Sequence, residues 1–302
     1  MASLTGPHAL ANDPSSCATV RFSDVGWTDI RATTALTSIL LEGLGYQAEE
    51  EALSVPGSFV ELQAGRVDAF LGAWLPTMAE NLDPFVAQGT VEVLGVNLEG
   101  ARFSLAVPTY LADHGLTDFT DIAAFGDALN HRILGIEPGN DGNRLAAALI
   151  GDRRFGLDGF EVVASSEQGM LDAVTSAIDA GQAVVFLAWE PHPMNTEFDL
   201  TYLDGGDEFF GPNHGASTVH TAIRAGYAEE CPNASRLLAN LVFSIDMENT
   251  LMGAVLDENQ SPRDAALAWL LANPSALEPW LEGVETLDGA AGLLAVRSHL
   301  GL

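Results

Sequence analysis

Three of the five tryptophans share one sequence context. Trp27, Trp74 and Trp189 each follow a short run of residues that predicts a β-strand. In open α/β sheets, ligands bind beyond the carboxyl ends of the strands. We therefore expect these three indole rings to line a shared pocket, although packing would explain any one of them equally well. Trp269 and Trp280 fall within helical patterns, and we expect them to serve packing.

A pocket walled by aromatic rings suits a methylated cation. A trimethylammonium group has no N–H to donate, so hydrogen bonds cannot select it, whereas the negative face of an aromatic ring attracts its diffuse charge. Each ring contributes about 0.5–2 kcal/mol. Three or four rings are therefore enough for micromolar binding, which corresponds to about 8 kcal/mol. The tryptophans predict a site for a quaternary ammonium ligand.

Two polar residues lie next to this predicted pocket. Asp29 follows Trp27 closely; its carboxylate would accept a hydrogen bond from an alcohol and would repel the carboxylate of glycine betaine. That preference favours choline, but Asp is also common at the start of a helix. Asn140 lies in a Gly-rich turn, where Asn also occurs for backbone reasons alone.

The sequence carries no sign of catalysis or of metal binding. The chain has no Lys, which rules out a Walker A loop, and it has neither an H-E-x-x-H motif nor a G-x-S-x-G elbow. Glu190 and His192 flank Trp189 and fit either support of its loop or packing. We expect a protein that is not an enzyme, with no catalytic residue, metal or cofactor.

The acidic composition narrows the possible partners. The chain has 302 residues with 42 acids against 12 bases, all Arg, and a formal net charge of −30. Such a surface repels nucleic acids and anionic membranes. It favours the approach of a cation, but adaptation to a salty habitat explains the same composition.

Predicted strands alternate with helical patterns, which indicates parallel α/β construction. The strands are expected at 18–25, 67–72, 91–96, 103–107, 133–136, 161–164 and 183–188, and the helices at 29–44, 58–65, 143–150, 167–180, 235–243 and through most of 261–302. If there are two lobes, the chain should cross between them near 103–107 and 210–214. The chain also has two cysteines, Cys17 and Cys231, which fit either a disulfide or two separate buried thiols.

Four segments resemble the motifs of the choline-binding proteins of rhizobial ABC transporters, within the glycine betaine/proline betaine substrate-binding family. They are Val25-Gly26-Trp27-Thr28-Asp29, Gly72-Ala73-Trp74-Leu75-Pro76-Thr77-Met78, the segment from Gly135 to Asn143, and Ala188-Trp189-Glu190-Pro191-His192-Pro193-Met194. The resemblance runs from about Cys17 to Gly292.

The resemblance implies a type II periplasmic-binding-protein fold: two α/β lobes joined by a two-stranded hinge, with the ligand in the cleft. Lobe I would comprise residues 17–105 and 213–302, lobe II residues 106–212, and residues 1–16 would be a flexible segment. It also implies a periplasmic location, a permease of an ABC transporter as partner, and a monomer. The small residues Ala9-Leu10-Ala11 are compatible with the end of a signal peptide.

The resemblance also assigns residues. The aromatic box of the family corresponds to Trp27, Trp74, Phe103 and Trp189. The two residues that contact the choline hydroxyl correspond to Asp29 and Asn140, and the family disulfide corresponds to Cys17 and Cys231. The family's choline binders have Tyr where this chain has Phe103, so a hydroxyl is lost while the ring face is kept. This departure leaves glycine betaine, dimethylsulfoniopropionate and trimethylamine N-oxide as alternatives to choline.

Overall fold

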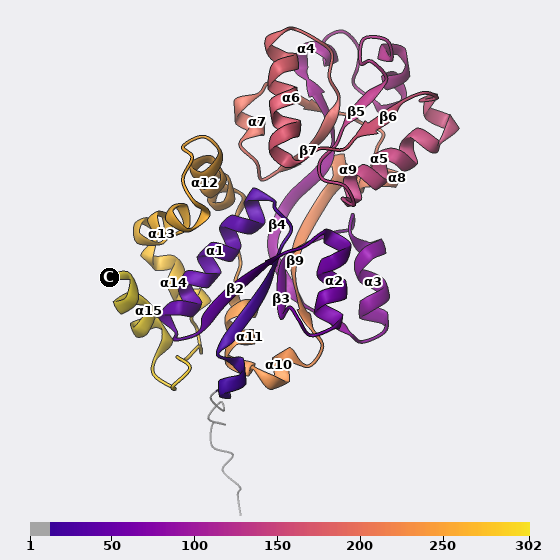
Figure 1. Cartoon of the computed structure of the whole chain (residues 1–302). Helices are drawn as coiled ribbons and strands as arrows, with labels where there is room; N and C mark the ends of the chain where they lie inside the picture. The colour runs from indigo at the N-terminus through magenta and orange to yellow at the C-terminus, as the bar shows by residue number, and fades with distance from the viewer. Residues whose placement is uncertain (1–12) are drawn as a thin grey trace, which may run out of the picture.

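The computed structural model describes residues 13–302, which form two lobes joined by two long strands (Figure 1). Lobe I carries β1 to β3, α1 to α3 and α10 to α15; lobe II carries α4 to α9 and β5 to β8. Strands β4 and β9 pair antiparallel and run between the lobes. The two-lobed α/β architecture predicted from the sequence is present, while its residue boundaries (17–105 with 213–302, and 106–212) stay a prediction.

The nine strands of the described chain form one sheet in the order β2-β1-β3-β9-β4-β7-β5-β6, with β8 paired to β4. Pairing is parallel within β2-β1-β3 and within β7-β5-β6, and antiparallel around β9 and β4. The strands are β1 (Thr19–Asp24), β2 (Gln47–Ala52), β3 (Ala69–Leu75), β4 (Val91–Pro108), β5 (Arg132–Leu134), β6 (Glu161–Val163), β7 (Phe186–Glu190), β8 (Leu200–Tyr202) and β9 (Ala216–Arg224).

Helices cover both faces of the sheet (Figure 1). They are α1 (Thr28–Gly43), α2 (Val55–Gln63), α3 (Ala79–Ala87), α4 (Thr109–Ala112), α5 (Asp141–Gly151), α6 (Glu167–Asp179), α7 (Met194–Glu197), α8 (Asp207–Phe210), α9 (Pro212–Gly215), α10 (Tyr227–Glu230), α11 (Pro232–Asn240), α12 (Ile245–Leu256), α13 (Pro262–Ala272), α14 (Leu277–Trp280) and α15 (Gly292–Leu300). Short 3₁₀ turns occupy Ser15–Cys17, Phe119–Phe125, Arg153–Phe155 and Pro274–Ala276.

Serine side chains fix where four of the longer helices begin. Ser54, Ser166, Ser244 and Ser261 are the N-caps of α2, α6, α12 and α13, and each hydroxyl accepts a bond from a backbone N–H in the first turn. Such a cap satisfies one of the unpaired donors at a helix start and stabilises the helix by about 1 kcal/mol. In α6, the N-cap Ser166 directly precedes Glu167, whose side chain contacts the start of α1.

Helix α1 is buried on nearly all sides. It packs against β3 on one side and against α12, α13 and α15 on the other, and of its residues from Thr28 to Leu41 only Arg31 is exposed. Its buried polar side chains include Thr33, Thr37 and Ser38, whose hydroxyls donate to backbone carbonyls one turn earlier in the helix. The residues at its N-terminus are thereby held rigidly at the top of lobe I, next to the hinge (Figure 1).

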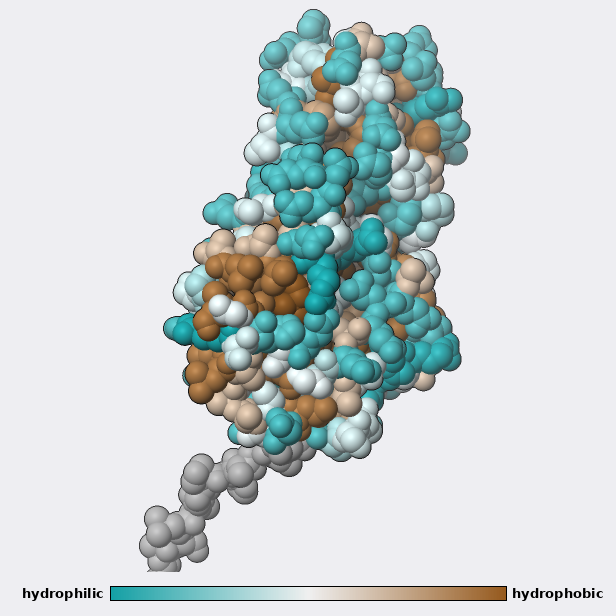
Figure 2. Space-filling view, turned by 60° about the vertical axis from the view of Figure 1, so that its left-hand side comes forward, coloured by the Kyte–Doolittle hydropathy of each residue, from teal (hydrophilic) through white to brown (hydrophobic). Residues whose placement is uncertain are grey.

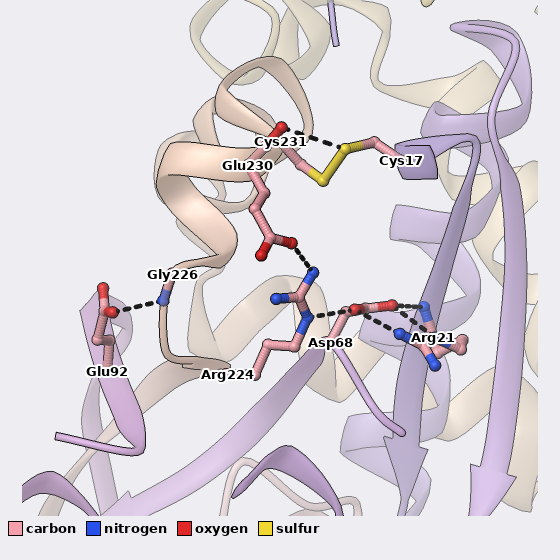
Figure 3. Close-up of polar contacts among 8 residues, drawn as sticks. All are labelled: Cys17, Arg21, Asp68, Glu92, Arg224, Gly226, Glu230 and Cys231. Atoms are coloured by element: carbon pink, nitrogen blue, oxygen red, sulfur yellow. Dashed lines mark hydrogen bonds and ion pairs between the residues drawn. A yellow bond between two sulfur atoms is a disulfide. The ribbon is translucent and has the colours of Figure 1, made fainter. Parts of the chain in front are cut away.

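A buried carboxylate and a disulfide fasten the end of lobe I that lies far from the hinge (Figure 3). Asp68 accepts hydrogen bonds from Nε of Arg21 at 2.9 Å and from Nε of Arg224 at 2.8 Å, which links β1 to β9. Cys17 and Cys231 form the disulfide that the family resemblance implied, with their Cα atoms 5.7 Å apart.

Several predicted elements need correction. The expected strands 91–96 and 103–107 are parts of one strand, β4, and the second expected crossing, 210–214, forms α8 and α9 just before β9. Of the predicted flexible segment 1–16, residues 1–12 lie outside the described residues. Asp13 is buried, and its carboxylate accepts bonds from Tyr46 and from the backbone of Asn233; the flexibility of the segment stays a prediction.

Polar and apolar surface are unevenly distributed (Figure 2). The face that carries α12 to α15 is largely hydrophilic over lobe II and shows an apolar area over lobe I. The exposed large apolar side chains of residues 242–302 are Val242, Leu267, Leu271, Leu294 and Leu302. None of the helices in residues 13–302 is both long and apolar enough to cross a bilayer.

Candidate ligand-binding site

One cavity between the lobes collects all six residues expected to contact ligand. Trp27, Asp29 and Trp74 line it from lobe I, Asn140 and Trp189 line it from lobe II, and Phe103 reaches it from β4. The cavity's other lining residues are Thr77, Met78, Ile136 and Asp141.

Strand ends and helix starts position the aromatic side chains. Trp27 occupies the turn between β1 and α1 and is the N-cap of α1. Trp74 and Trp189 are the next-to-last residues of β3 and β7, inside these strands rather than beyond them as the sequence suggested. Phe103 lies on β4 directly opposite Trp189 on β7. The rings therefore come from four separate segments that meet where the two lobes join.

The rings enclose the cavity as a closed group. The centroid of the Phe103 ring lies 6.4 Å from that of Trp74 and 6.3 Å from that of Trp189, and all four rings of the box are less than 10% exposed. The Phe103 ring packs directly against Gly142, and any larger residue there would clash with it, because an added Cβ would lie 2.3 Å from Cζ of Phe103. Such an apolar, water-excluding wall strengthens the attraction between ring faces and a cation.

Hydrogen bonds and ring packing hold two of the indoles in place. Nε1 of Trp27 donates to Oε1 of Glu137 at 2.9 Å, a bond that runs from lobe I to lobe II. The Trp189 ring meets the edge of the His192 imidazole with 4.8 Å between centroids. His192 therefore does support the Trp189 loop, the first of the two roles that the sequence left open.

Asp29 supplies the polar end of the cavity. It is the second residue of α1, in the first turn, where an acidic side chain is also favoured, while the N-cap is Trp27. Among residues 13–302, Oδ1 of Asp29 finds no hydrogen-bond partner, although the side chain is buried. Burial, and then the negative charge of Glu167, raise the pKa of Asp29 to about 7.

A second carboxyl group faces the same region without a salt-bridge partner. Glu248 on α12 is buried, and burial together with the charge of Asp29 raises its pKa well above the ordinary value for Glu. Buried like charges disfavour simultaneous ionisation. Ionisation of either group therefore opposes ionisation of the other.

Asn140 combines a structural and a cavity-lining position. It is the N-cap of α5, where its Oδ1 accepts a bond from the Gly142 N–H at 2.7 Å, and its Nδ2 donates to Glu137 at 2.9 Å. The turn role expected for Asn is thus present. An amide carbonyl accepts two bonds and an amide nitrogen donates two, so one of each remains for a ligand hydroxyl.

Three further residues of this region could not be identified from the sequence. Glu137 orients both Trp27 and Asn140, Asp141 lines the cavity and accepts bonds from Asn81 of lobe I, and Glu167 reaches the start of α1. Two of them fall within a motif quoted for the family, but their contacts join segments more than 50 residues apart in the chain. Only the fold reveals such contacts.

The arrangement can hold a small cation. Aromatic faces surround the space, the carboxyl groups of Asp29 and Asp141 line it, and the amide of Asn140 lies beside it. In the described part of the chain, no group of three or more His, Cys, Asp or Glu side chains is placed to hold a metal ion.

Known proteins share this architecture. An ABC-transporter choline binding protein in complex with choline superposes with a TM-score of 0.94 at 54% identity, covering 96% of this chain and 100% of that one. The unliganded semi-closed conformation of an ABC-transporter choline binding protein gives 0.88 at 54% identity, covering 95% and 100%. Because identity and coverage are nearly equal, the difference indicates that the lobes here resemble the choline-bound arrangement more closely.

The likeness confirms the predicted type II periplasmic-binding-protein fold. In addition, the glycine betaine/carnitine transport binding protein GbuC of Listeria monocytogenes is 30% identical over 164 residues, about half of each chain: 54% of this one and 53% of that one. Residues 18–272 match the family described as the substrate binding domain of ABC-type glycine betaine transport system (OpuAC). The chain therefore belongs to this family of ABC-transporter substrate-binding domains.

Proposed function

We propose that this protein captures choline between its lobes and delivers it to the permease of an ABC importer. The observation that carries the proposal is the convergence of Trp27, Trp74, Phe103 and Trp189 on one cavity that ends at the buried carboxyl group of Asp29. The 54% identical structure with choline bound supports the same ligand. The family's role in transport supports a periplasmic location and a binding rather than an enzymatic activity.

In this proposal each side chain has a separate task. The ring faces surround the trimethylammonium group, which carries the diffuse positive charge. Asp29 accepts the hydrogen bond of the choline hydroxyl and adds attraction to the cation, and Asn140 contacts the same hydroxyl. Phe103 contributes a ring face without a hydroxyl, so the box keeps its attraction for the cation.

Glycine betaine is the second candidate ligand, along with dimethylsulfoniopropionate and trimethylamine N-oxide. Phe103 favours these alternatives, because the choline binders that this chain resembles have Tyr there. An ionised Asp29 opposes glycine betaine, since two carboxylates would then share a closed site. The family description, which names glycine betaine, leaves this comparison to experiment.

Calorimetric titration with each ligand tests the proposal. Choline should bind with a dissociation constant in the micromolar range and more tightly than glycine betaine at pH 8. Trp189→Ala should weaken choline binding by about tenfold or more, since one cation–π wall contributes up to about 2 kcal/mol. Trp269→Ala is the matched control, because Trp269 stacks on Trp280 in lobe I and does not line the cavity. No heat at millimolar choline would refute the proposal.

A further inference from the structure

A carboxylate of lobe II caps a helix of lobe I at the edge of the cleft. Oε2 of Glu167 accepts two hydrogen bonds from Thr28, one from the backbone N–H at 2.9 Å and one from the hydroxyl at 2.8 Å. Thr28 is the first residue of α1 and Glu167 the first residue of α6. The bonds therefore exist only while the lobes are closed.

His192 holds the other oxygen of the same carboxylate. The backbone N–H of Met194 donates to Nδ1 of His192 at 2.9 Å, so Nδ1 carries no proton. In neutral His192 the proton is then on Nε2, which lies 3.1 Å from Oε1 of Glu167 and donates to it. Glu167 receives three donors in all.

The surroundings make this carboxylate a strong acceptor. Thr28, Glu167 and His192 are 6%, 7% and 2% exposed, so water competes little for the bonds. The positive ends of both α1 and α6 point at the charge, which favours an anion there. Hydrogen bonds to a charged group contribute more than bonds between neutral groups.

The bond also reaches the ligand cavity through the chain. Thr28 stands between Trp27 and Asp29, which both line the cavity. When Glu167 holds Thr28, it fixes the turn that presents the indole and the carboxyl group to the ligand. The contact of Arg144 with Glu80, which also joins the lobes, lies at more exposed side chains.

We propose that Glu167, with Thr28 and His192, is a closure latch that sets how long the bound ligand stays in the cleft. The inference rests on the proposed function, since the ligand that stays is choline. Closing follows the first contact of the ligand with one lobe, so the latch acts on dissociation and leaves association nearly unchanged. Glu167 is thus a positioning residue that does not touch the ligand.

Stopped-flow tryptophan fluorescence with choline tests the latch. Glu167→Gln should speed dissociation by about tenfold to a hundredfold, as expected for a lost bond to a buried charge, and should change association by less than about threefold. Asp172→Asn is the matched control: it removes one negative charge from an exposed position of the same helix and should leave both rates unchanged.

A second pair of variants keeps the test valid if Glu167→Gln folds poorly. Thr28→Val removes the hydroxyl donor and should speed dissociation, while Thr28→Ser keeps the donor and should restore the wild-type rate. In the combined Thr28→Val and Glu167→Gln variant, the dissociation rate should rise by less than the product of the two single increases, because the two side chains share one interaction.

The outcomes separate the latch from the function. A wild-type protein that gives no choline signal contradicts the proposed function. A wild-type protein that binds choline, together with Glu167→Gln or Thr28→Val variants that release it at the wild-type rate, contradicts the latch alone. If Glu167→Gln and Asp172→Asn speed the dissociation of choline equally, net charge, and not the bond to Thr28, controls release.

Discussion

Asp29 carries the discrimination between ligands at the scale of single residues. Its carboxyl group is buried beside Glu167 and Glu248, and burial raises its pKa to about 7. A cation in the aromatic box stabilises the ionised form, whereas a ligand carboxylate is stabilised by the protonated form, which can donate a hydrogen bond. The same residue therefore favours choline when ionised and tolerates glycine betaine when neutral.

The affinities for choline and glycine betaine should consequently change in opposite directions with pH. Because choline binding favours the carboxylate, its affinity should rise as pH increases through about 7, by up to about tenfold per pH unit below that value. Glycine betaine binding should weaken over the same range. Calorimetric titrations between about pH 5.5 and 8.5 measure the affinities for both ligands, and the slope of each affinity with pH should change near the pKa of Asp29.

Asp29→Asn is the control for this prediction. The amide does not titrate, so both profiles should become flat, and the loss of affinity at pH 8 should be larger for choline. Parallel profiles for the two ligands in the wild type, or a choline profile that keeps its slope in Asp29→Asn, would show that another group is responsible.

The single residues of the cavity were largely predictable from the sequence. The three repeats of one predicted context pointed to one place and grouped Trp27, Trp74 and Trp189, although Trp74 and Trp189 lie inside their strands and not after them. Phe103 and Asn140 needed the family resemblance. Glu167 could not be found, because nothing in its own segment shows that its side chain meets Thr28, 139 positions away.

At the scale of elements, prediction failed where long-range pairing overrides local pattern. The segment 91–108 contains two apolar runs, 91–96 and 103–107, which suggested two strands. Pairing with β9 joins them into one strand, with register shifts between Val93 and Gly95, between Val96 and Leu98, and between Leu98 and Ala101. Strand β2, with its consecutive glutamates Glu49 to Glu51, has the pattern of a solvated face because it is the exposed edge of the sheet.

The disulfide belongs to this scale, since it ties the start of β1 to the start of α11. Replacing both Cys17 and Cys231 by Ser should lower the free energy of unfolding by about 2–4 kcal/mol, as is typical for loss of a native disulfide. Choline affinity should change by less than about twofold, because the bridge lies at the end of lobe I away from the hinge (Figures 1 and 3).

Urea unfolding with and without reductant checks this expectation. The reduced wild-type protein should unfold like the double variant, while the oxidised wild type should be more stable. If the double variant folds normally but loses much of its choline affinity, the disulfide does affect the cleft, which contradicts this expectation.

At the scale of the whole molecule, the closed cleft and the acidic surface act on the ligand at different distances. Bonds such as that between Trp27 and Glu137 act only when the lobes meet. The net charge of −30 acts before contact, because it attracts cations from solution over about 10 Å at moderate salt. The same charge opposes compact folding through self-repulsion. The sequence left two explanations for it: attraction of a cationic ligand and adaptation to salt.

Salt should separate these two explanations. Raising NaCl from about 0.02 M to about 1 M shortens the screening length to a few ångströms, so the association rate of choline should fall by about tenfold if the charge steers the cation. Glycine betaine, which has no net charge, is the matched ligand, and its association rate should fall far less. The melting temperature of the unliganded protein should rise over the same range, because screening reduces the repulsion between its acids. If stability rises with salt while choline associates at one rate throughout, the acidic surface serves adaptation to salt alone and the aromatic box captures its ligand without long-range help.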